Sequence, residues 1–321
     1  MAGSTHDVKK LLAELRKEVP RRGFDRHASI LKSASELPIE LCSPAVTALT
    51  AQKAIQAIIM FPQQIQRGWD YVPKQALLFT ANGVIHLLAS IWPDEEPQIT
   101  ALEGCAVMYM NFKLVLLYGF LEIAAQGERT PIHLSMEFNT VDWHHLWRPL
   151  QQLLQATQPG PVLTAEQDAS SPIFERALQE LPLKFSNGLQ LYGLLPGEEL
   201  EEAIFQAGLW NYWLYLFRKP VSADTMLLLT SHYMVVISEE MYVKRGWIVS
   251  YIPRDNITGI RNQACGSQQE LAIQLKRGDQ SMEYKLLLKG ETVEAWRRQW
   301  VQHGGQWEDL PERQAQEGQL P

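Results

Sequence analysis

Hydrophobic residues in the first half of the chain recur in short runs of the length of β-strands. Leu77 to Thr80 precedes Asn82-Gly83, and the apolar run from Val84 to Ala89 follows. Asn-Gly between two apolar runs is typical of a tight hairpin turn. In the second half, the residues 271–275 alternate apolar and polar side chains, as strands with one buried face do. The pattern predicts short antiparallel strands.

Two later segments change to the spacing of a helix with one apolar face. The first predicted helix carries Trp143, Leu146, Trp147, Leu150, Leu153 and Leu154. The second carries Val293, Trp296, Trp300 and Val301, after Gly290-Glu291-Thr292. Each helix therefore follows a series of strands.

The strand pattern repeats along the chain. Leu77 to Thr80 recurs at Leu227 to Thr230, an offset of 230 − 80 = 150, and PIHLSMEF (131–138) falls opposite SMEYKLLL (281–288). Upstream, Glu36-Leu37-Pro38-Ile39 matches Glu180-Leu181-Pro182-Leu183 at an offset of 144. A period this long indicates two copies of one structural unit.

The repeat divides the chain into five predicted parts. They are an N-terminal amphipathic helix with its connector (1–29), a first repeat (30–154), a linker rich in Pro, Gly and Ser (155–172), a second repeat (173–303) and a disordered tail (304–321). Because strands precede one helix in each copy, the predicted class is α+β with antiparallel sheets.

The second repeat resembles a bacterial pleckstrin-homology-like (PH or GRAM) domain. The resemblance depends on GLLPGEELEEAIF (193–205), the hairpin LLLTSHYMVVIS around 228–238, WIVSYIPRDNITGI (247–260) and the closing helix with Trp296. It implies a bent antiparallel β-barrel closed by a C-terminal helix, and through the repeat it implies two such barrels in tandem. Proteins of this kind that bind phosphoinositides use a run of Lys and Arg in the loop between the first two strands. That run is missing here, since the first repeat offers only Arg67 and Lys74 and the second offers an aromatic run ending in Arg218-Lys219.

Composition narrows the classes of function. The formal charge of −7 argues against a nucleic-acid partner, because phosphate binding needs a positive surface. Cys42, Cys105 and Cys265 are too far apart to indicate a disulfide framework or a zinc site. No signal peptide or membrane-spanning run is visible, since the most apolar run (209–217) has nine residues. We therefore expect a cytoplasmic protein without a cofactor.

The first candidate surface is the aromatic run LWNYWLYLFRKP (209–220). It contains Trp210, Tyr212, Trp213 and Tyr215, followed by Arg218 and Lys219. Such rings are favoured at membrane interfaces, and the two cations suit anionic headgroups. The same run also fits a strand packed within the protein or a surface that binds another protein.

The second candidate is the N-terminal segment, where Val8, Leu11, Leu12, Leu15 and Val19 form one helical stripe before Pro20. Residues 1–32 contain eight Lys or Arg and four acidic residues, a balance of +4, which leaves −11 for the remainder. A basic amphipathic helix can lie on a membrane or occupy a partner's groove. The charge contrast favours docking on the protein's own acidic body.

Candidates for catalysis or metal binding are few. Asp142, His144 and His145, with Glu137 nearby, have the residue types of a metal or acid–base site, but no third ligand follows at a suitable spacing. His232, Glu239 and Glu240 are expected to be solvated turn residues. The chain has no P-loop, no GxGxxG motif and no GxSxG motif.

These observations favour a non-catalytic binding or scaffolding protein that acts through protein–protein interaction. A peripheral membrane module is the alternative, and a metal-dependent enzyme is a third hypothesis. The sequence does not indicate the oligomeric state.

Overall fold

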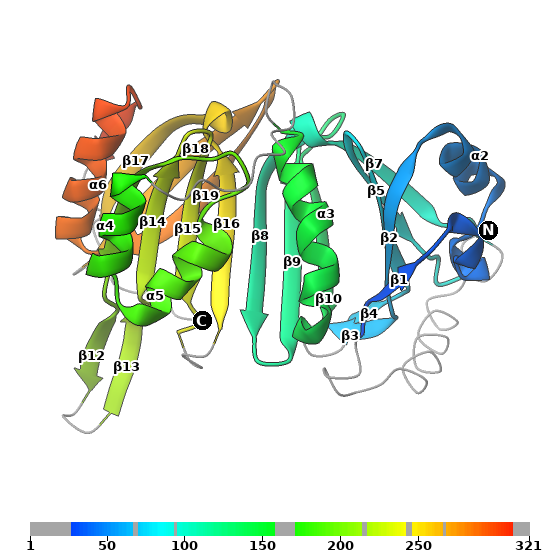
Figure 1. The fold of residues 1–321 in the computed structure, drawn as a ribbon, viewed down its shortest axis with the longest axis horizontal. Coiled ribbons are helices and arrows are strands. Elements are labelled where there is room, and N and C mark those ends of the chain that lie inside the picture. Colours follow the sequence, from blue (N-terminus) through cyan, green and yellow to red (C-terminus); the bar gives the residue numbers. More distant parts are fainter. Residues whose placement is uncertain are drawn as a thin grey trace, which may run out of the picture. The chain divides into compact units, whose positions relative to one another are not determined.

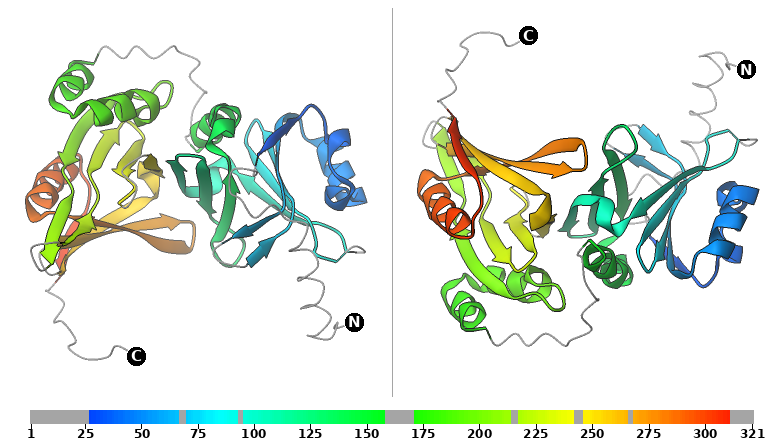
Figure 2. Two further views of the ribbon diagram at one scale, coloured as in Figure 1. Left: turned by 90° about the horizontal axis from the view of Figure 1, so that it is seen from below. Right: turned by 90° about the horizontal axis from the view of Figure 1, so that it is seen from above.

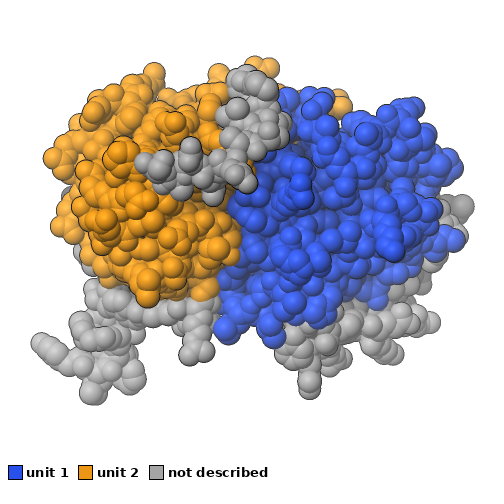
Figure 3. Space-filling model, in the orientation of Figure 1, with its two compact units in different colours: residues 1–107, 113–122, 134–162 blue, residues 108–112, 123–133, 163–321 orange. Residues whose placement is uncertain are grey.

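The computed structural model describes residues 27–66, 70–92, 95–157, 171–213, 217–241, 246–265 and 268–310 (Figure 1). The chain forms two compact units, which Figure 3 colours separately. Unit 1 comprises residues 1–107, 113–122 and 134–162, and unit 2 comprises residues 108–112, 123–133 and 163–321. Within the described ranges there are five α-helices and mostly antiparallel sheets, so the predicted α+β class is confirmed.

Unit 1 is built on a five-stranded antiparallel sheet of order β1-β2-β5-β6-β7. Its strands are β1 (Ser29–Leu31), β2 (Ile55–Phe61), β5 (Gln75–Thr80), β6 (Gly83–Leu88) and β7 (Gln98–Glu103). A separate pair is formed by β3 (Gln64–Gln66) and β4 (Asp70–Val72). The next three strands each have residues in both units: β8 (Val107–Val115), β9 (Tyr118–Ala125) and β10 (Ile132–Phe138).

The hairpin predicted at Asn82-Gly83 is confirmed, with its turn one residue earlier. Thr80 pairs with Gly83, so the two-residue loop consists of Ala81 and Asn82. Gly83 is needed because a Cβ there would lie 2.1 Å from the backbone oxygen of Leu102. The glycine therefore permits close approach of β7 and is not itself a residue of the turn.

Strands β5 and β6 are buried on both faces, which explains why their sequences are continuously apolar. One face packs against α2 (Pro44–Gln52) and the short helices η2 (Ala34–Glu36) and η3 (Ile39–Leu41). This core consists of Leu37, Leu41, Val46, Ile58, Ala76, Leu78, Ile85, Leu87 and Ala89. Helix α3 (Trp143–Gln155) lies on the other side of β2 (Figure 2). Its predicted apolar stripe is confirmed by the burial of Leu146, Leu150, Leu153 and Leu154.

Unit 2 opens with helices, which corrects the prediction of strands followed by one helix. Helices α4 (Pro172–Glu180) and α5 (Leu183–Gly188) and the π-helical turn η6 (Leu189–Gly193) precede its first strand. Pro172 begins α4 directly after Ser171, and Phe174 and Ala177 are its buried residues. A proline at the first helical position and this spacing are helix signals that strand-based periodicity overlooks.

The strands of unit 2 form two larger sheets and one separate strand pair. The first has the order β11-β14-β15-β16, from β11 (Leu200–Gln206), β14 (Thr225–Thr230), β15 (Tyr233–Glu239) and β16 (Trp247–Pro253). After the 3₁₀ turn η7 (Arg254–Asn256), the second is formed by β17 (Ile257–Cys265), β18 (Gln268–Arg277) and β19 (Gln280–Leu288).

Strand β20 (Trp307–Leu310) pairs in parallel with β17. The sequence assigned these four residues to a disordered tail, and that assignment is wrong for them. Arg261 in β17 donates to Glu308 at 2.9 Å, and the Trp307 ring N–H donates to Asp309 at 3.0 Å. The hydrogen bond from Trp307 is the main cause that lowers the pKa of Asp309. The remainder of the predicted tail, residues 311–321, lies outside the described part.

The two halves of the chain repeat one order of elements. β5 and β14 begin at Gln75 and Thr225, and η4 (Gly104–Ala106) and η7 begin at Gly104 and Arg254. Both pairs differ by 150 residues (225 − 75 = 254 − 104 = 150), the offset found in the sequence. The domain boundaries and the closed PH-like barrels remain predictions.

The closing helix α6 (Gly290–Gln302) packs on β11 and β18 of unit 2. Trp296 is 1% exposed in a core that also contains Trp300, Leu271 and Leu288. Burial of Trp296 is thus confirmed, and in unit 1 Leu146 occupies the corresponding buried place while Trp143 is half-buried.

Candidate functional site

The aromatic candidate run forms a strand pair. β12 (Leu209–Trp213) and β13 (Phe217–Ser222) are antiparallel, with Tyr212 opposite Arg218 and Asn211 opposite Lys219. The structure describes the backbone of this strand pair but not the side chains of Trp210, Tyr212, Trp213, Arg218 and Lys219. Tyr215 lies outside the described residues. The proposed interaction surface therefore stays a prediction.

The N-terminal stripe of Val8, Leu11, Leu12 and Leu15 also lies outside the described residues. The description begins at His27, where the chain is fixed to unit 1. The backbone N–H of Ala28 donates to Asp142 Oδ2 at 2.8 Å, and the His27 ring nitrogen Nδ1 lies 3.3 Å from the same oxygen. The buried carboxylate of Asp142 thus holds the point where the N-terminal segment joins unit 1.

The structure does not bring Asp142, His144 and His145 together as a metal site. The His144 ring contacts the backbone oxygen of Val141 at 2.8 Å and lies against the His145 ring, at 3.6 Å between centroids. Glu137 accepts a hydrogen bond from the Tyr118 hydroxyl at 3.2 Å. Among the residues that the structure describes, no group of three His, Cys, Asp or Glu side chains is arranged to hold a metal ion.

A groove of about 660 Å³ lies in unit 1 between β1, α2 and the start of β2. Its floor is apolar, with Leu37, Val46 and Ile58 buried and Ile55 and Ala57 half-buried. Its rim is polar, formed by Lys32, Ser33, Ser35, Thr47, Thr50 and Gln56. An apolar floor with a polar rim is the usual composition of a binding groove.

The groove exists because β1 is shorter than β2. Strand β1 pairs only with Ile58, Ile59 and Met60, and the chain then turns away at Lys32. In the described part of unit 1, no strand pairs with residues 55–57 on this outer edge. Helix α2 forms the opposite wall, started by Ser43, whose hydroxyl accepts from the Val46 N–H at 3.2 Å. An open sheet edge is therefore exposed beside a helix.

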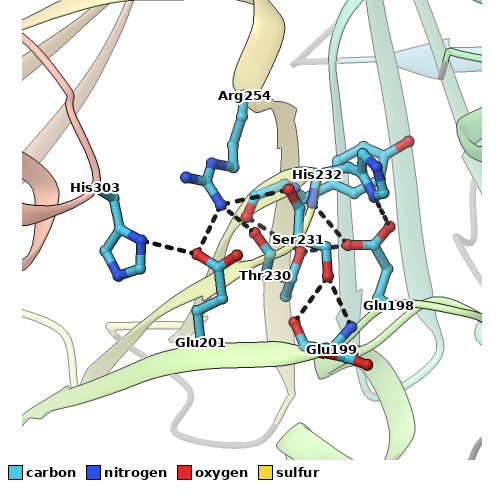
Figure 4. A network of polar contacts seen from close by, with 9 residues as sticks. Glu198, Glu199, Glu201, Thr230, Ser231, His232, Arg254 and His303 are labelled. Carbon is cyan, nitrogen blue, oxygen red and sulfur yellow. Dashed lines mark hydrogen bonds and ion pairs between the residues drawn. The ribbon is translucent and has the colours of Figure 1, made fainter. Parts of the chain in front are cut away.

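A polar network in unit 2 joins the start of β11 to the β14–β15 turn (Figure 4). Glu198 accepts from the Thr230 hydroxyl at 2.7 Å, and from the backbone and ring of His232 at 2.9 Å each. The Glu198 side chain is 3% exposed, so these bonds satisfy a buried carboxylate.

Arg254 extends this network. Its guanidinium donates to Glu201 at 2.7 Å and to the backbone oxygen of Thr230 at 2.8 Å, and His303 lies 3.2 Å from the same Glu201 oxygen (Figure 4). Side-chain carboxylates and a backbone oxygen of unit 2 accept these bonds, as expected of a structural network that fixes a turn.

The prediction that His232 and Glu239 are solvated turn residues is wrong for Glu239. Glu239 is buried and pairs with Lys184 of α5 at 2.5 Å, while the Lys184 ammonium lies 4.8 Å from the centroid of Trp247. His232 is half-exposed but bonded to Glu198. Helix α5, absent from the sequence-based assignment, supplies the partner that buries Glu239.

The sequence did not single out the groove. Ser43-Pro44, a cap followed by proline, marks the start of α2 and could have located the wall. No local pattern shows where β1 ends relative to β2, because that depends on pairing between residues about 30 positions apart.

Among the described helices, none is long and apolar enough to span a membrane.

No protein-family model matches the chain, and no curated protein matches it. Among solved structures, the chain is similar to the hSac2 domain from the human phosphoinositide phosphatase Sac2, at 13% identity over 44% of this chain and 94% of that chain, with a TM-score of 0.28. A likeness at this TM-score supports no argument about fold or function.

Proposed function

We propose that the protein is a non-catalytic protein-binding module that takes an extended peptide segment of a partner into the groove between β2 and α2. The open edge of β2 at residues 55–57 is the observation that carries the proposal. Unpaired backbone groups at a sheet edge add a further strand when an extended peptide is available.

The lining of the groove supports this class of ligand. The floor formed by Leu37, Val46 and Ile58 would accept apolar side chains at alternate positions of the peptide, because strand side chains point to opposite faces. Ser and Thr side chains along the rim suit the peptide's polar positions. Among the described residues that line the groove, Lys32 alone is charged, so this part of the lining offers no cluster of cations for a phosphorylated ligand.

The proposal also includes the tandem PH-like architecture and the non-catalytic role. The repeated order of elements, with strands before a closing helix, supports two PH-like units in tandem. The arrangement of Asp142, His144 and His145, in which Asp142 holds the N-terminal chain, supports a role without catalysis.

The test is peptide display on the purified full-length chain, followed by fluorescence polarisation with the enriched peptides. We expect enrichment of peptides with apolar residues at every second position. Ala51→Trp, on the groove side of α2, should then weaken binding about tenfold or more by filling the groove.

Ala48→Trp is the matched control, because Ala48 is exposed on the same helix but does not line the groove. It should bind as the wild type does. Failure to enrich any peptide, or equal binding by the Ala51→Trp and wild-type proteins, would overturn the proposal.

A further inference from the structure

Unit 1 exposes three large apolar side chains where β8 turns into β9. Leu116 and Leu117 form the turn and are 61% and 48% exposed, and Val141, just before α3, is 58% exposed. The Thr140 hydroxyl donates to the backbone oxygen of Leu116, so the two segments are in contact. These three residues constitute the leucine tip, which lies at the lower end of β8 and β9 in Figure 1.

The backbone of the leucine tip is strained. Leu116 has φ = 53°, the only positive φ of a non-glycine residue in the described chain. Two-residue hairpin turns with this backbone are normally formed by Asn or Gly, which adopt positive φ at little cost. Two exposed leucines in a strained turn of this kind suggest a site whose side chains contact another group.

An aromatic cluster of unit 1 adjoins the start of β9, just after the leucine tip. Phe138 is fully buried at the end of β10 and stacks on Trp143, with centroids 6.1 Å apart. Trp143 in turn stacks on Trp147 at 5.3 Å. Gly119, two residues after Leu117, lies against the Phe138 ring, so this packed cluster begins directly beside the turn.

The N-terminal segment joins unit 1 beside this tip. Asp142, which binds the backbone N–H of Ala28, directly follows Val141 in the sequence. The seven residues 20–26 separate the predicted apolar stripe from His27, and even fully extended they reach at most about 25 Å. The linker therefore limits how far the near end of the stripe, Val19, can lie from His27, the residue before the one bonded to Asp142.

We propose that residues 1–26 dock on the leucine tip through Val8, Leu11, Leu12 and Leu15. The opposite net charges of the N-terminal segment and the rest of the first half of the chain support this docking. Residues 1–26 contain seven basic and four acidic residues, a balance of +3, while residues 27–157 contain seven basic and eleven acidic residues, a balance of −4. Opposite charges favour the association, and burial of the apolar stripe against Leu116 and Leu117 provides the contact.

The first test is hydrogen–deuterium exchange of the full-length chain. We expect slow exchange both in residues 8–19 and at the β8–β9 turn. Leu12→Asp should speed exchange at the turn about tenfold, because a charge in the stripe breaks the contact. Ala13→Asp is the matched control, since Ala13 is the neighbouring residue outside the stripe, and it should leave exchange at the turn unchanged.

The reciprocal test is limited trypsin cleavage after Arg21 and Arg22. Leu117→Asp should release the segment and raise the cleavage rate about fivefold or more, whereas Leu191→Asp, at a leucine 58% exposed in unit 2, should not. Equal rates in both variants and the wild type would overturn the proposal.

A second copy of the chain or a membrane could cover the leucine tip instead of residues 1–26. Each alternative gives its own experimental result, and either result would contradict intramolecular docking. If a second copy covers the leucine tip, protection of the turn will depend on protein concentration and a dimer will appear in size-exclusion chromatography. If a membrane covers it, the turn will be unprotected in solution, and vesicles of phosphatidylcholine and phosphatidylserine will bind the wild type but not the Leu117→Asp protein.

Discussion

Glu198 accepts two hydrogen bonds from one residue, His232, through its backbone N–H and its ring, both at 2.9 Å. The carboxylate also accepts from the hydroxyl of Thr230, which is 1% exposed. One side chain at the start of β11 thus ties down the turn between β14 and β15. A buried carboxylate with this set of partners stabilises the turn it binds.

We expect Glu198→Ala to lower the free energy of unfolding by about 1 to 2 kcal/mol, because the buried Thr230 hydroxyl loses its carboxylate acceptor and the turn loses its two bonds from His232. Urea denaturation measures the loss. Glu199→Ala is the matched control, since Glu199 is exposed and contacts Ser231 through its backbone N–H and oxygen. Equal stability of the two variants would contradict a structural role of the network.

The closing helix of unit 2 gives a second prediction. Trp296→Ala should lower the free energy of unfolding by about 3 to 5 kcal/mol, because it leaves a large cavity in the core. Val301→Ala, at a residue 50% exposed on the same helix, should change stability by less than about 0.5 kcal/mol. Denaturation curves that coincide for the two variants would show that α6 is not part of the core.

The local sequence predicted the elements that form from their own periodicity. The stripe of α3 and the β5–β6 hairpin are visible because their signals lie within a dozen residues. The repeat offset of 150 also recurs in the structure, at β5 and β14. Helices α4 and α5 were missed because the linker composition and the search for strands obscured the short pattern beginning at Pro172.

Strand β20, the groove and the burial of Glu239 all depend on contacts between residues far apart in the sequence. Local periodicity therefore could not predict them. Strand β20 is four residues long and is defined by its contact with β17, about 47 residues earlier. The groove depends on β1 ending at Leu31 while β2 begins at Ile55. The buried role of Glu239 depends on Lys184, 55 residues away.

Two strand glycines allow a packing prediction with an internal control. A Cβ at Gly119 would lie 2.4 Å from the ring of Phe138, which is fully buried, so Gly119→Ala should lower the free energy of unfolding by about 1 to 3 kcal/mol. At Gly259 the nearest atom is 3.6 Å away, and Gly259→Ala should be neutral or slightly stabilising. Thermal unfolding of both variants tests this difference, which would be absent if the Phe138 ring can move aside.

His86 in β6 makes the stability of unit 1 depend on pH. Its ring nitrogen Nε2 bonds to the Gln75 side-chain oxygen at 2.8 Å, and burial lowers the pKa of His86 to about 4. In the unfolded chain the ordinary histidine pKa is about 6.5. Between these values the unfolded state binds a proton that the folded state does not, so the free energy of unfolding falls as the pH falls.

Relative to neutral pH, the contribution of His86 should reach about 2.5 kcal/mol of lost stability at pH 4.5. His86→Gln keeps a polar side chain in β6 but cannot titrate, so its unfolding free energy should fall by that much less over the same range. Urea denaturation of the wild-type and His86→Gln proteins at pH 7.5, 6.0 and 4.5 provides the comparison, because carboxylates such as Asp309 titrate in both. Parallel curves for the two proteins would show that His86 is protonated in the folded state and that its burial does not exclude the charge.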